Sequence, residues 1–369
     1  MAPPCPPYAA GVSLADTGAT TRSLAGGGRP ARSLLVVTGS GRSGTSLVAG
    51  LLKRLGCRVP EPEVPADESN PRGFAESQWV VDLHTRLLRA AGVQVSDARP
   101  SAWAQTAKVG MDPRVQAEVR AFLQRQFAAA DDVVIKDPRL SWFLPVWRRA
   151  AQDVGATPRV ITMLRHPAAV VTSKQRYYGG RQGEACRAAG WVNQILFTER
   201  ATRDAPRVFL RYERLLEDWT ATLAHAGEIL DLGVVRDAPA PAIRRAHEFI
   251  DVSLDRSRPA WGDLRVPAAL QAQAEQVWDQ VKRLADDTGA PAPETIDQLD
   301  TLRAAYTVYY TEAESVAYSS IADARSHSDK RAQPSLPLPV RRVARRVPRR
   351  LRYAIPRPVR AGIIRALGR

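Results

Sequence analysis

A glycine-rich loop that directly follows an apolar segment constrains the fold of this chain more than any other feature. Residues 32–38 form a short apolar run, which is typical of a strand buried in a parallel sheet. Residues 45–56 have the pattern of a helix that ends at Gly56. A loop between a strand and a helix N-terminus directs several backbone N–H groups to one point, where the helix dipole is positive. The sequence therefore predicts a phosphate-binding loop made of Gly39, Ser40, Gly41, Arg42, Ser43, Gly44, Thr45 and Ser46.

The cation of this loop is unusual for a nucleoside triphosphate site. Gly39 and Gly44 have the glycine spacing of a Walker A loop, in which a lysine follows the second glycine. Thr45 stands at that position, and the cation inside the loop is Arg42. We therefore expect the loop to bind a phosphate, although it fits an ATPase poorly.

Strand-like and helix-like segments alternate along most of the chain. Further strands are predicted at 132–136, 159–164 and 207–211, and helices at 76–91, 113–130, 140–153, 167–178, 184–203 and 213–230. This alternation predicts an α/β fold, namely a P-loop-like, three-layer α/β/α arrangement with a central parallel sheet.

The chain divides into three regions by composition. Residues 1–31 are rich in Pro, Gly, Ala, Ser and Thr, and are predicted to be disordered because they have too little apolar surface to offset the entropy of ordering. The α/β domain is expected over 32–325, with a helical C-terminal part at 267–321, and a Pro- and Arg-rich basic tail over 326–369. Helices are predicted at 267–288 and 294–321 in this part, and the second has apolar residues near heptad spacing, which fits either packing on the domain or a coiled-coil contact in a homodimer.

Most of the net charge of +15 belongs to the tail, which carries +12 of it. Residues 331–369 contain 12 Arg and no acidic residue, so the rest of the chain has 41 basic and 38 acidic side chains. The body is therefore not expected to be a cationic nucleic-acid-binding domain. In 334–369, Arg pairs alternate with Val, Leu and Ile, a pattern that favours an anionic membrane surface. Contact with nucleic acid and a solvated tail without a partner stay open as alternatives.

The remaining composition points to a cytoplasmic protein. No run of about 18 apolar residues occurs, and the N-terminus has no secretory signal pattern. The three cysteines, Cys5, Cys57 and Cys186, suit a reducing compartment and form no C-x-x-C pair. We expect no metal site, and a location in the cytoplasm or at the inner face of its membrane.

A second candidate phosphate site follows the predicted strand at 159–164. Arg165 stands at the carboxyl end of this strand, where open α/β sheets bind ligands, and Pro167 favours a helix start. Ser173 lies eight residues after Arg165, about two helical turns further on. The guanidinium and the hydroxyl together can hold one phosphate.

The two motifs in this order resemble the PAPS-dependent sulfotransferases, over roughly residues 35–260. The resemblance implies that the glycine loop, Gly39 to Ser46, holds the 5′-phosphosulfate of PAPS, 3′-phosphoadenosine 5′-phosphosulfate. It implies that Arg165 and Ser173 hold the 3′-phosphate. The sequence departs from the cytosolic members at Arg42, where they have a lysine, and at His166, where Asp or Asn is common; His166 is expected to cap the following helix.

Candidate catalytic residues lie between the two motifs. Sulfuryl transfer is expected to need a cation on the transferred group and a base for the acceptor hydroxyl, by analogy with phosphoryl transfer. Arg42 is the first candidate cation and Lys136, at the end of the second strand, the next; a solvated charge cluster is the alternative for Lys136. Glu76 is the candidate base, since Asn70, Gly73, Phe74 and Glu76 match a stretch of the bacterial and glycan sulfotransferases. The alternatives are that Glu76 is only an N-terminal helix charge, and that His84 is the base.

Two further contacts follow from the resemblance. Tyr212, at the end of the fourth strand, is expected either to contact the adenine or to pack as a core aromatic, and Arg256 is expected to reach the 3′-phosphate. The expected function is transfer of a sulfuryl group from PAPS to a hydroxyl of a glycan, glycolipid or small natural product. A P-loop-like small-molecule or nucleotide kinase and a nucleic-acid-binding protein with a degenerate nucleotide fold are the alternatives.

Overall fold

The computed structural model describes residues 32–332, apart from 69, 180–181, 252–259 and 287–290. Three expectations lie outside these residues: the disorder of 1–31, the placement of Arg256, and the tail beyond Ala332. Everything that concerns the two phosphate motifs lies inside them.

The centre of the fold is a four-stranded parallel sheet with the order β2-β1-β3-β4. Its strands are β1 (Ser33–Gly39), β2 (Asp132–Lys136), β3 (Thr157–Leu164) and β4 (Arg207–Arg211). All four predicted strands are confirmed. β1 pairs with β2 on one side and β3 on the other, which places its carboxyl end, and so the glycine loop, in the middle of the sheet edge.

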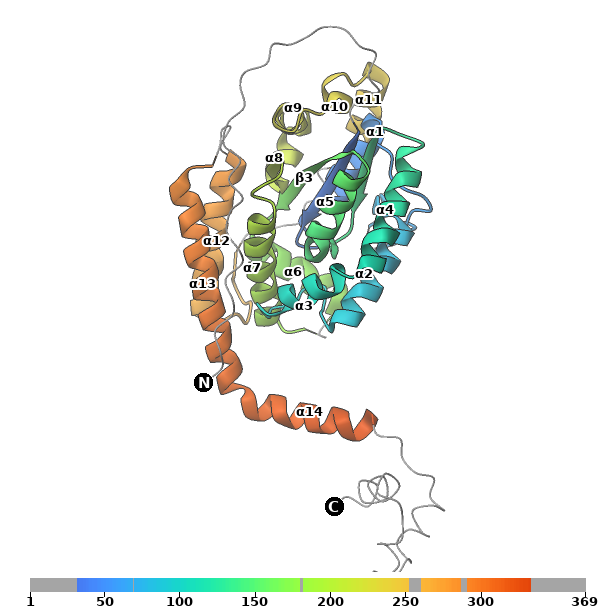
Figure 1. The fold of residues 1–369 in the computed structure, drawn as a ribbon. Coiled ribbons are helices and arrows are strands. Elements are labelled where there is room, and N and C mark those ends of the chain that lie inside the picture. The colour runs from blue at the N-terminus through green and yellow to red at the C-terminus, as the bar shows by residue number, and fades with distance from the viewer. Residues whose placement is uncertain (1–31, 69, 180–181, 252–259, 287–290, 333–369) are drawn as a thin grey trace, which may run out of the picture.

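Helices cover both faces of the sheet, so the predicted α/β fold is confirmed (Figure 1). Leu35 and Val37 of β1 face a core formed with α1 (Thr45–Leu55), α8 (Tyr212–Glu217), α9 (Trp219–Ile229) and α11 (Ala240–Phe249). Leu34 and Val36 face the opposite core, which includes α2 (Gln78–Ala91), α4 (Pro113–Phe127), the 3-10 turn η1 (Leu140–Phe143) and α5 (Leu144–Asp153). This alternation along the strand is what a sheet buried on both faces requires.

Several helices were not predicted or have different bounds. The short helices α3 (Ala102–Gly110), α10 (Gly233–Arg236) and α11 were missed. The predicted helix at 213–230 is divided into α8 and α9, because Asp218 is extended and its side chain accepts a hydrogen bond from the backbone N–H of Ala221 (3.0 Å). An aspartate in this conformation starts a new helix instead of continuing the old one.

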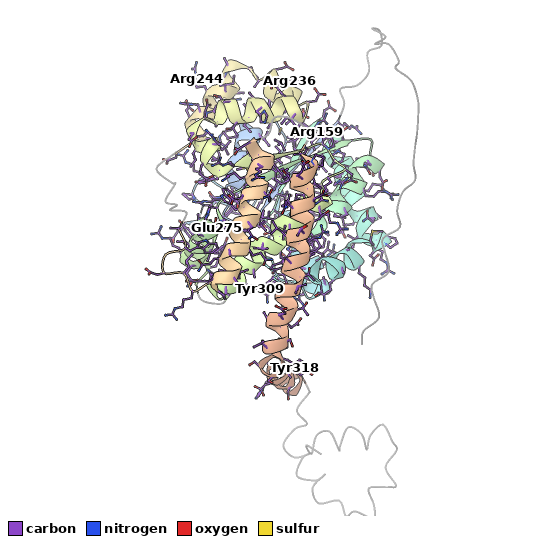
Figure 2. All side chains as sticks on the ribbon, turned by 90° about the vertical axis from the view of Figure 1, so that its left-hand side faces the viewer. Arg159, Arg236, Arg244, Glu275, Tyr309 and Tyr318 are labelled. Atoms are coloured by element: carbon purple, nitrogen blue, oxygen red, sulfur yellow. The ribbon has the colours of Figure 1, made fainter. Side chains whose placement is uncertain are left out.

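The last helices pack beside the sheet, in direct contact with β4, α6 (Pro167–Tyr178) and α7 (Glu184–Ala201). Figure 2 shows α12 (Ala268–Asp286) and α13 (Pro293–Val316) side by side, while α14 (Tyr318–Ala332) extends away from the body in Figure 1. Leu299, Leu302 and Tyr306 of α13 are buried, whereas Val308 and Val316 are exposed. The first part of α13 thus packs on the domain, one of the two expected roles, and the homodimer stays a prediction.

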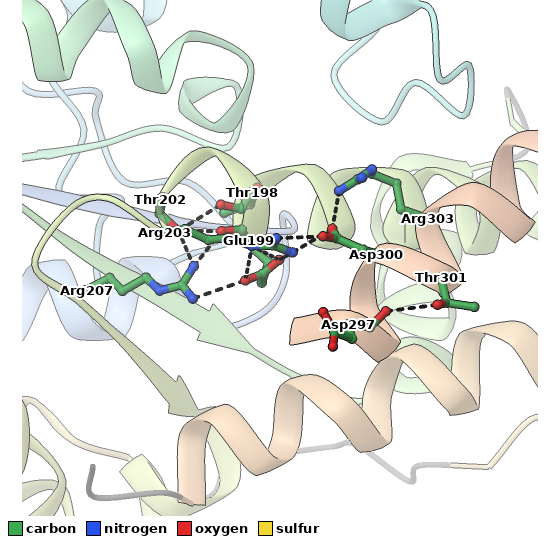
Figure 3. A network of polar contacts seen from close by, with 9 residues as sticks. All are labelled: Thr198, Glu199, Thr202, Arg203, Arg207, Asp297, Asp300, Thr301 and Arg303. Atoms are coloured by element: carbon green, nitrogen blue, oxygen red, sulfur yellow. Dashed lines mark hydrogen bonds and ion pairs between the residues drawn. The ribbon is translucent and has the colours of Figure 1, made fainter. Parts of the chain in front are cut away.

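A buried carboxylate fixes α13 to α7 (Figure 3). Glu199 of α7 is fully buried and accepts hydrogen bonds from Arg203, in the turn just after this helix, and from Arg207 of β4. Arg203 also donates to both carboxylate oxygens of Asp300 on α13, at 2.8 and 2.9 Å. Each buried charge therefore has opposite charges beside it, as burial in a low-dielectric interior demands. Among the described residues, no helix combines the length and apolar character needed to cross a membrane.

Candidate active site

The glycine loop turns sharply between β1 and α1, and two of its glycines have backbones that leave no room for a side chain. Gly39 has φ of 136°, and a Cβ there would lie 2.5 Å from the carbonyl oxygen of Met163 on β3. Gly44 has φ of 88°, and a Cβ there would lie 2.5 Å from a ring carbon of Tyr212. Arg42 between them also has a positive φ, 76°. The loop is therefore held tightly against the ends of β3 and β4, with its first helical turn open to the cavity.

The two sequence motifs meet in space. The Nε of Arg42 donates to the hydroxyl of Ser173 (3.2 Å), although the two residues are 131 positions apart in the sequence. Arg165 donates through Nη1 to the carbonyl oxygen of Arg42 (2.9 Å), and its guanidinium lies 4.3 Å from the ring centroid of Tyr212. A second aromatic ring, that of Tyr177, lies 4.1 Å from the guanidinium of Arg42. The glycine loop and the Arg165–Ser173 pair thus form one continuous cationic surface.

This surface lines a cavity of about 660 Å³. Ten of the predicted site residues contribute to its wall: Gly41, Arg42, Gly44, Thr45, Ser46, Glu76, Lys136, Arg165, Ser173 and Tyr212. Gly39, Ser40 and Ser43 are buried behind the wall, where they shape the loop. The matched residues Asn70, Gly73 and Phe74 lie on the wall as well, and the Asn70 side chain donates to the carbonyl oxygen of Gly73 (2.6 Å).

Glu76 and Lys136 form an ion pair inside this cavity. Both are buried, with 6% and 3% of their surface exposed, and Lys136 Nζ donates to Glu76 Oε1 and to the hydroxyl of Ser46 (2.8 Å). Lys136 is therefore not part of a solvated charge cluster, because it joins the candidate base to the glycine loop. Burial raises the pKa of Glu76, and the neighbouring ammonium of Lys136 offsets only part of this effect.

The neighbouring ionisable side chains point away from the cavity into the core. His84 is fully buried; its Nε2 accepts from the indole N–H of Trp147 (2.8 Å), so its Nδ1 carries the proton donated to Asp137 (2.9 Å). Burial alone would raise the pKa of Asp137, but its contacts with His84 and Arg139 hold it below its ordinary value. His84 has no path to a substrate in this arrangement.

His166 caps the start of α6, as expected. The backbone N–H of Ala168 donates a hydrogen bond to His166 Nδ1 (3.3 Å).

Sequence reasoning missed several residues at this site. Arg139, Arg176 and Tyr177 line the cavity, and Lys174 lies behind the glycine loop. Lys174, Arg176 and Tyr177 lie on α6 within about one helical turn of Ser173, and this position is the signal that could have identified them. Arg139 belongs to a polar run that begins with Lys136, the last residue of β2.

No protein-family model matches the sequence, and no curated relative does. Among solved structures, the sulfotransferase domain of the Synechococcus PCC 7002 olefin synthase matches with a TM-score of 0.41 and 19% identity, covering 70% of this chain and 97% of that one. The sulfotransferase domain from the curacin biosynthetic pathway matches with a TM-score of 0.40 and 15% identity, covering 68% of this chain and 98% of that one. Both of these solved structures are sulfotransferase domains, and this chain covers almost the whole of each.

Proposed function

We propose that this protein is a PAPS-dependent sulfotransferase, which transfers a sulfuryl group from PAPS to a hydroxyl. One observation carries the proposal: Arg42 of the glycine loop contacts Ser173 and Arg165, while the loop's Ser46 contacts Lys136, which holds Glu76. Two anion-binding surfaces and an acid–base pair therefore share one cavity. Together they match a nucleotide with phosphates at both its 5′ and 3′ ends.

Each part has a role in nucleotide binding. The backbone N–H groups of the loop and the start of α1 suit the 5′-phosphosulfate, because they direct several hydrogen-bond donors to one anion. Arg165 and Ser173 suit the 3′-phosphate, since a guanidinium and a hydroxyl can bind one phosphate together. Tyr212, which lies against Arg165, supplies an aromatic surface for the adenine.

The transfer step uses Glu76 and Lys136. The acceptor oxygen attacks sulfur, its proton passes to the Glu76 carboxylate, and the bond from sulfur to the bridging phosphate oxygen breaks to release PAP, adenosine 3′,5′-bisphosphate. Lys136 and Arg42 stabilise the negative charge on the transferred group and on the leaving phosphate. A Glu76 carboxylate with a raised pKa is a stronger base than an exposed one, which favours this proton transfer.

The alternatives explain fewer of these contacts. A kinase with a Walker lysine is disfavoured because Thr45 follows the second loop glycine, and because Arg165 and Ser173 would then have no phosphate to bind. A nucleic-acid-binding protein would need a cationic body, whereas the excess charge lies in 331–369.

A thermal-shift titration with PAP, ADP and ATP tests the proposal. PAP should stabilise the protein at lower concentration than ADP or ATP, because only PAP has a phosphate for Arg165 and Ser173. Stronger stabilisation by ATP would refute the sulfotransferase and favour the kinase.

We further propose a glycan, glycolipid or small natural product as the acceptor. We also propose a cytoplasmic location in which 334–369 contacts the anionic inner membrane surface.

A further inference from the structure

A lysine lies buried directly behind the glycine loop. Lys174 follows Ser173 on α6 and is only 4% exposed. Its Nζ donates to the hydroxyl of Ser40 in the loop (3.0 Å) and to that of Ser96 (2.9 Å). A Cβ on Gly41, which lines the cavity, would lie 4.0 Å from Lys174 Cε. The ammonium is therefore separated from the cavity by the thickness of the loop alone.

This ammonium has no countercharge in the part of the chain that the structure describes. Ser40 and Ser96 are neutral, and no described carboxylate forms an ion pair with Lys174. The groups that face it from α7 are Arg187, a like charge, and the thiol of Cys186. Burial and the charge of Arg187 lower the pKa of Lys174 to about 8. A buried cation without an anion beside it is costly, so an anion bound in the adjacent loop would stabilise the charged form of Lys174.

We propose that Lys174 is a positioning residue whose ammonium pairs, from behind the loop, with an anion bound in the glycine loop. Lys174 takes up a proton when that anion binds. It would replace the Walker lysine, from behind the loop instead of from within it. The proposal concerns the anion at the 5′ end of the nucleotide, and in naming that anion it rests on the proposed function. The attraction between the Lys174 ammonium and a bound anion applies to any phosphate in the loop.

The proposal has a defined dependence on pH. An anion favours the charged form of Lys174, so its pKa in the complex must exceed its value in the free protein. Between these two values, binding takes up a proton, and the affinity for the anion falls as the pH rises. The 5′-phosphate contributes nothing in this range, because its second pKa is about 6.

Calorimetric titration with PAP over about pH 7–9.5, in buffers of different ionisation enthalpy, measures this proton uptake. Wild-type protein should take up a proton above about pH 8. Lys174→Met should bind PAP about tenfold more weakly at pH 7 and show no such uptake. Lys174→Arg should keep the affinity and also lack the uptake, since arginine stays charged throughout. Cys186→Ser, the matched control at the neighbouring titratable group, should behave as wild type.

Two further measurements separate this role from a structural one. Adenosine 3′-phosphate, which leaves the loop empty, should bind wild type and Lys174→Met equally. The Tm of ligand-free Lys174→Met should equal or exceed that of wild type, because the variant removes an unpaired buried charge. Uptake that persists in Lys174→Arg, or equal weakening of both nucleotides in Lys174→Met, would overturn the proposal.

Inorganic pyrophosphate distinguishes this inference from the proposed function. If pyrophosphate binds with Lys174-dependent proton uptake and PAP does not bind, the sulfotransferase is refuted and the role of Lys174 stands. If PAP binds without any uptake that Lys174 controls, the role of Lys174 is refuted and the proposed function stands. Binding of neither ligand refutes both.

Discussion

Replacing Glu76 by Gln tests the proposed base while leaving its surroundings nearly intact. The amide has the size of the carboxylate and keeps an oxygen that can accept the hydrogen bond from Lys136. Lys136 also keeps its bond to Ser46, so its ammonium should stay at the loop. The variant therefore removes one proton acceptor from the cavity and little else.

The expected loss follows from the chemistry of general bases. A positioned base contributes about 100- to 10,000-fold to the rate, and Glu76→Gln should lower kcat within this range. PAP affinity should change little, since no nucleotide phosphate is assigned to Glu76. In wild type, the rate should rise with pH as the Glu76 carboxyl loses its proton, with a midpoint above the ordinary range for glutamate because its pKa is raised. The variant should lack this rise.

The assay measures PAP formed from PAPS with a panel of acceptors: a phenol, an alkyl glucoside and a glycolipid. Glu68→Gln is the matched control, because Glu68 lines the same cavity but is exposed. That variant should keep the wild-type rate. If Glu76→Gln retains full activity, Glu76 is not the base; if PAP affinity falls together with kcat, its role is to hold Lys136 in place.

Three further predictions concern the nucleotide site and the tail. Arg165→Ala should weaken PAP about 10- to 100-fold and AMP much less, measured by calorimetry, because only PAP has a 3′-phosphate; equal losses would contradict this assignment. Gly44→Ala should lower both Tm and PAP affinity, since its Cβ would lie 2.5 Å from a tyrosine ring carbon. Gly73→Ala, also at positive φ but with nothing within 4 Å of the added Cβ, should keep PAP affinity. Deleting 334–369 should abolish sedimentation with anionic liposomes without changing Tm, and binding retained after deletion would place the membrane contact elsewhere.

Local sequence signals predicted the strands and most of the helices. The strand at β1, the glycine loop and the start of α1 are set by neighbouring residues, because an apolar run, glycines and a helical pattern act over a few positions. The short helix α11 was missed, although its ten residues are amphipathic; a helix of this length is marginal in isolation and depends here on packing against α1. The division between α8 and α9 was also not predicted, although Asp218 is a favourable N-cap residue for α9.

The sequence by itself determined where the phosphate-binding elements begin and end, but the tertiary structure decided what each charge does. Lys136 and Asp137 are adjacent at the end of β2, yet Lys136 contacts Glu76 and Ser46 in the cavity while Asp137 contacts His84 in the core. Consecutive residues of an extended chain point to opposite sides, so the local pattern allows either assignment. Which side is cavity and which is core depends on distant partners: Ser46 and Glu76 lie 90 and 60 positions from Lys136, and His84 lies 53 positions from Asp137. The contacts of Lys174 could not be predicted for the same reason, because its partners Ser40 and Ser96 are 134 and 78 positions away in the sequence.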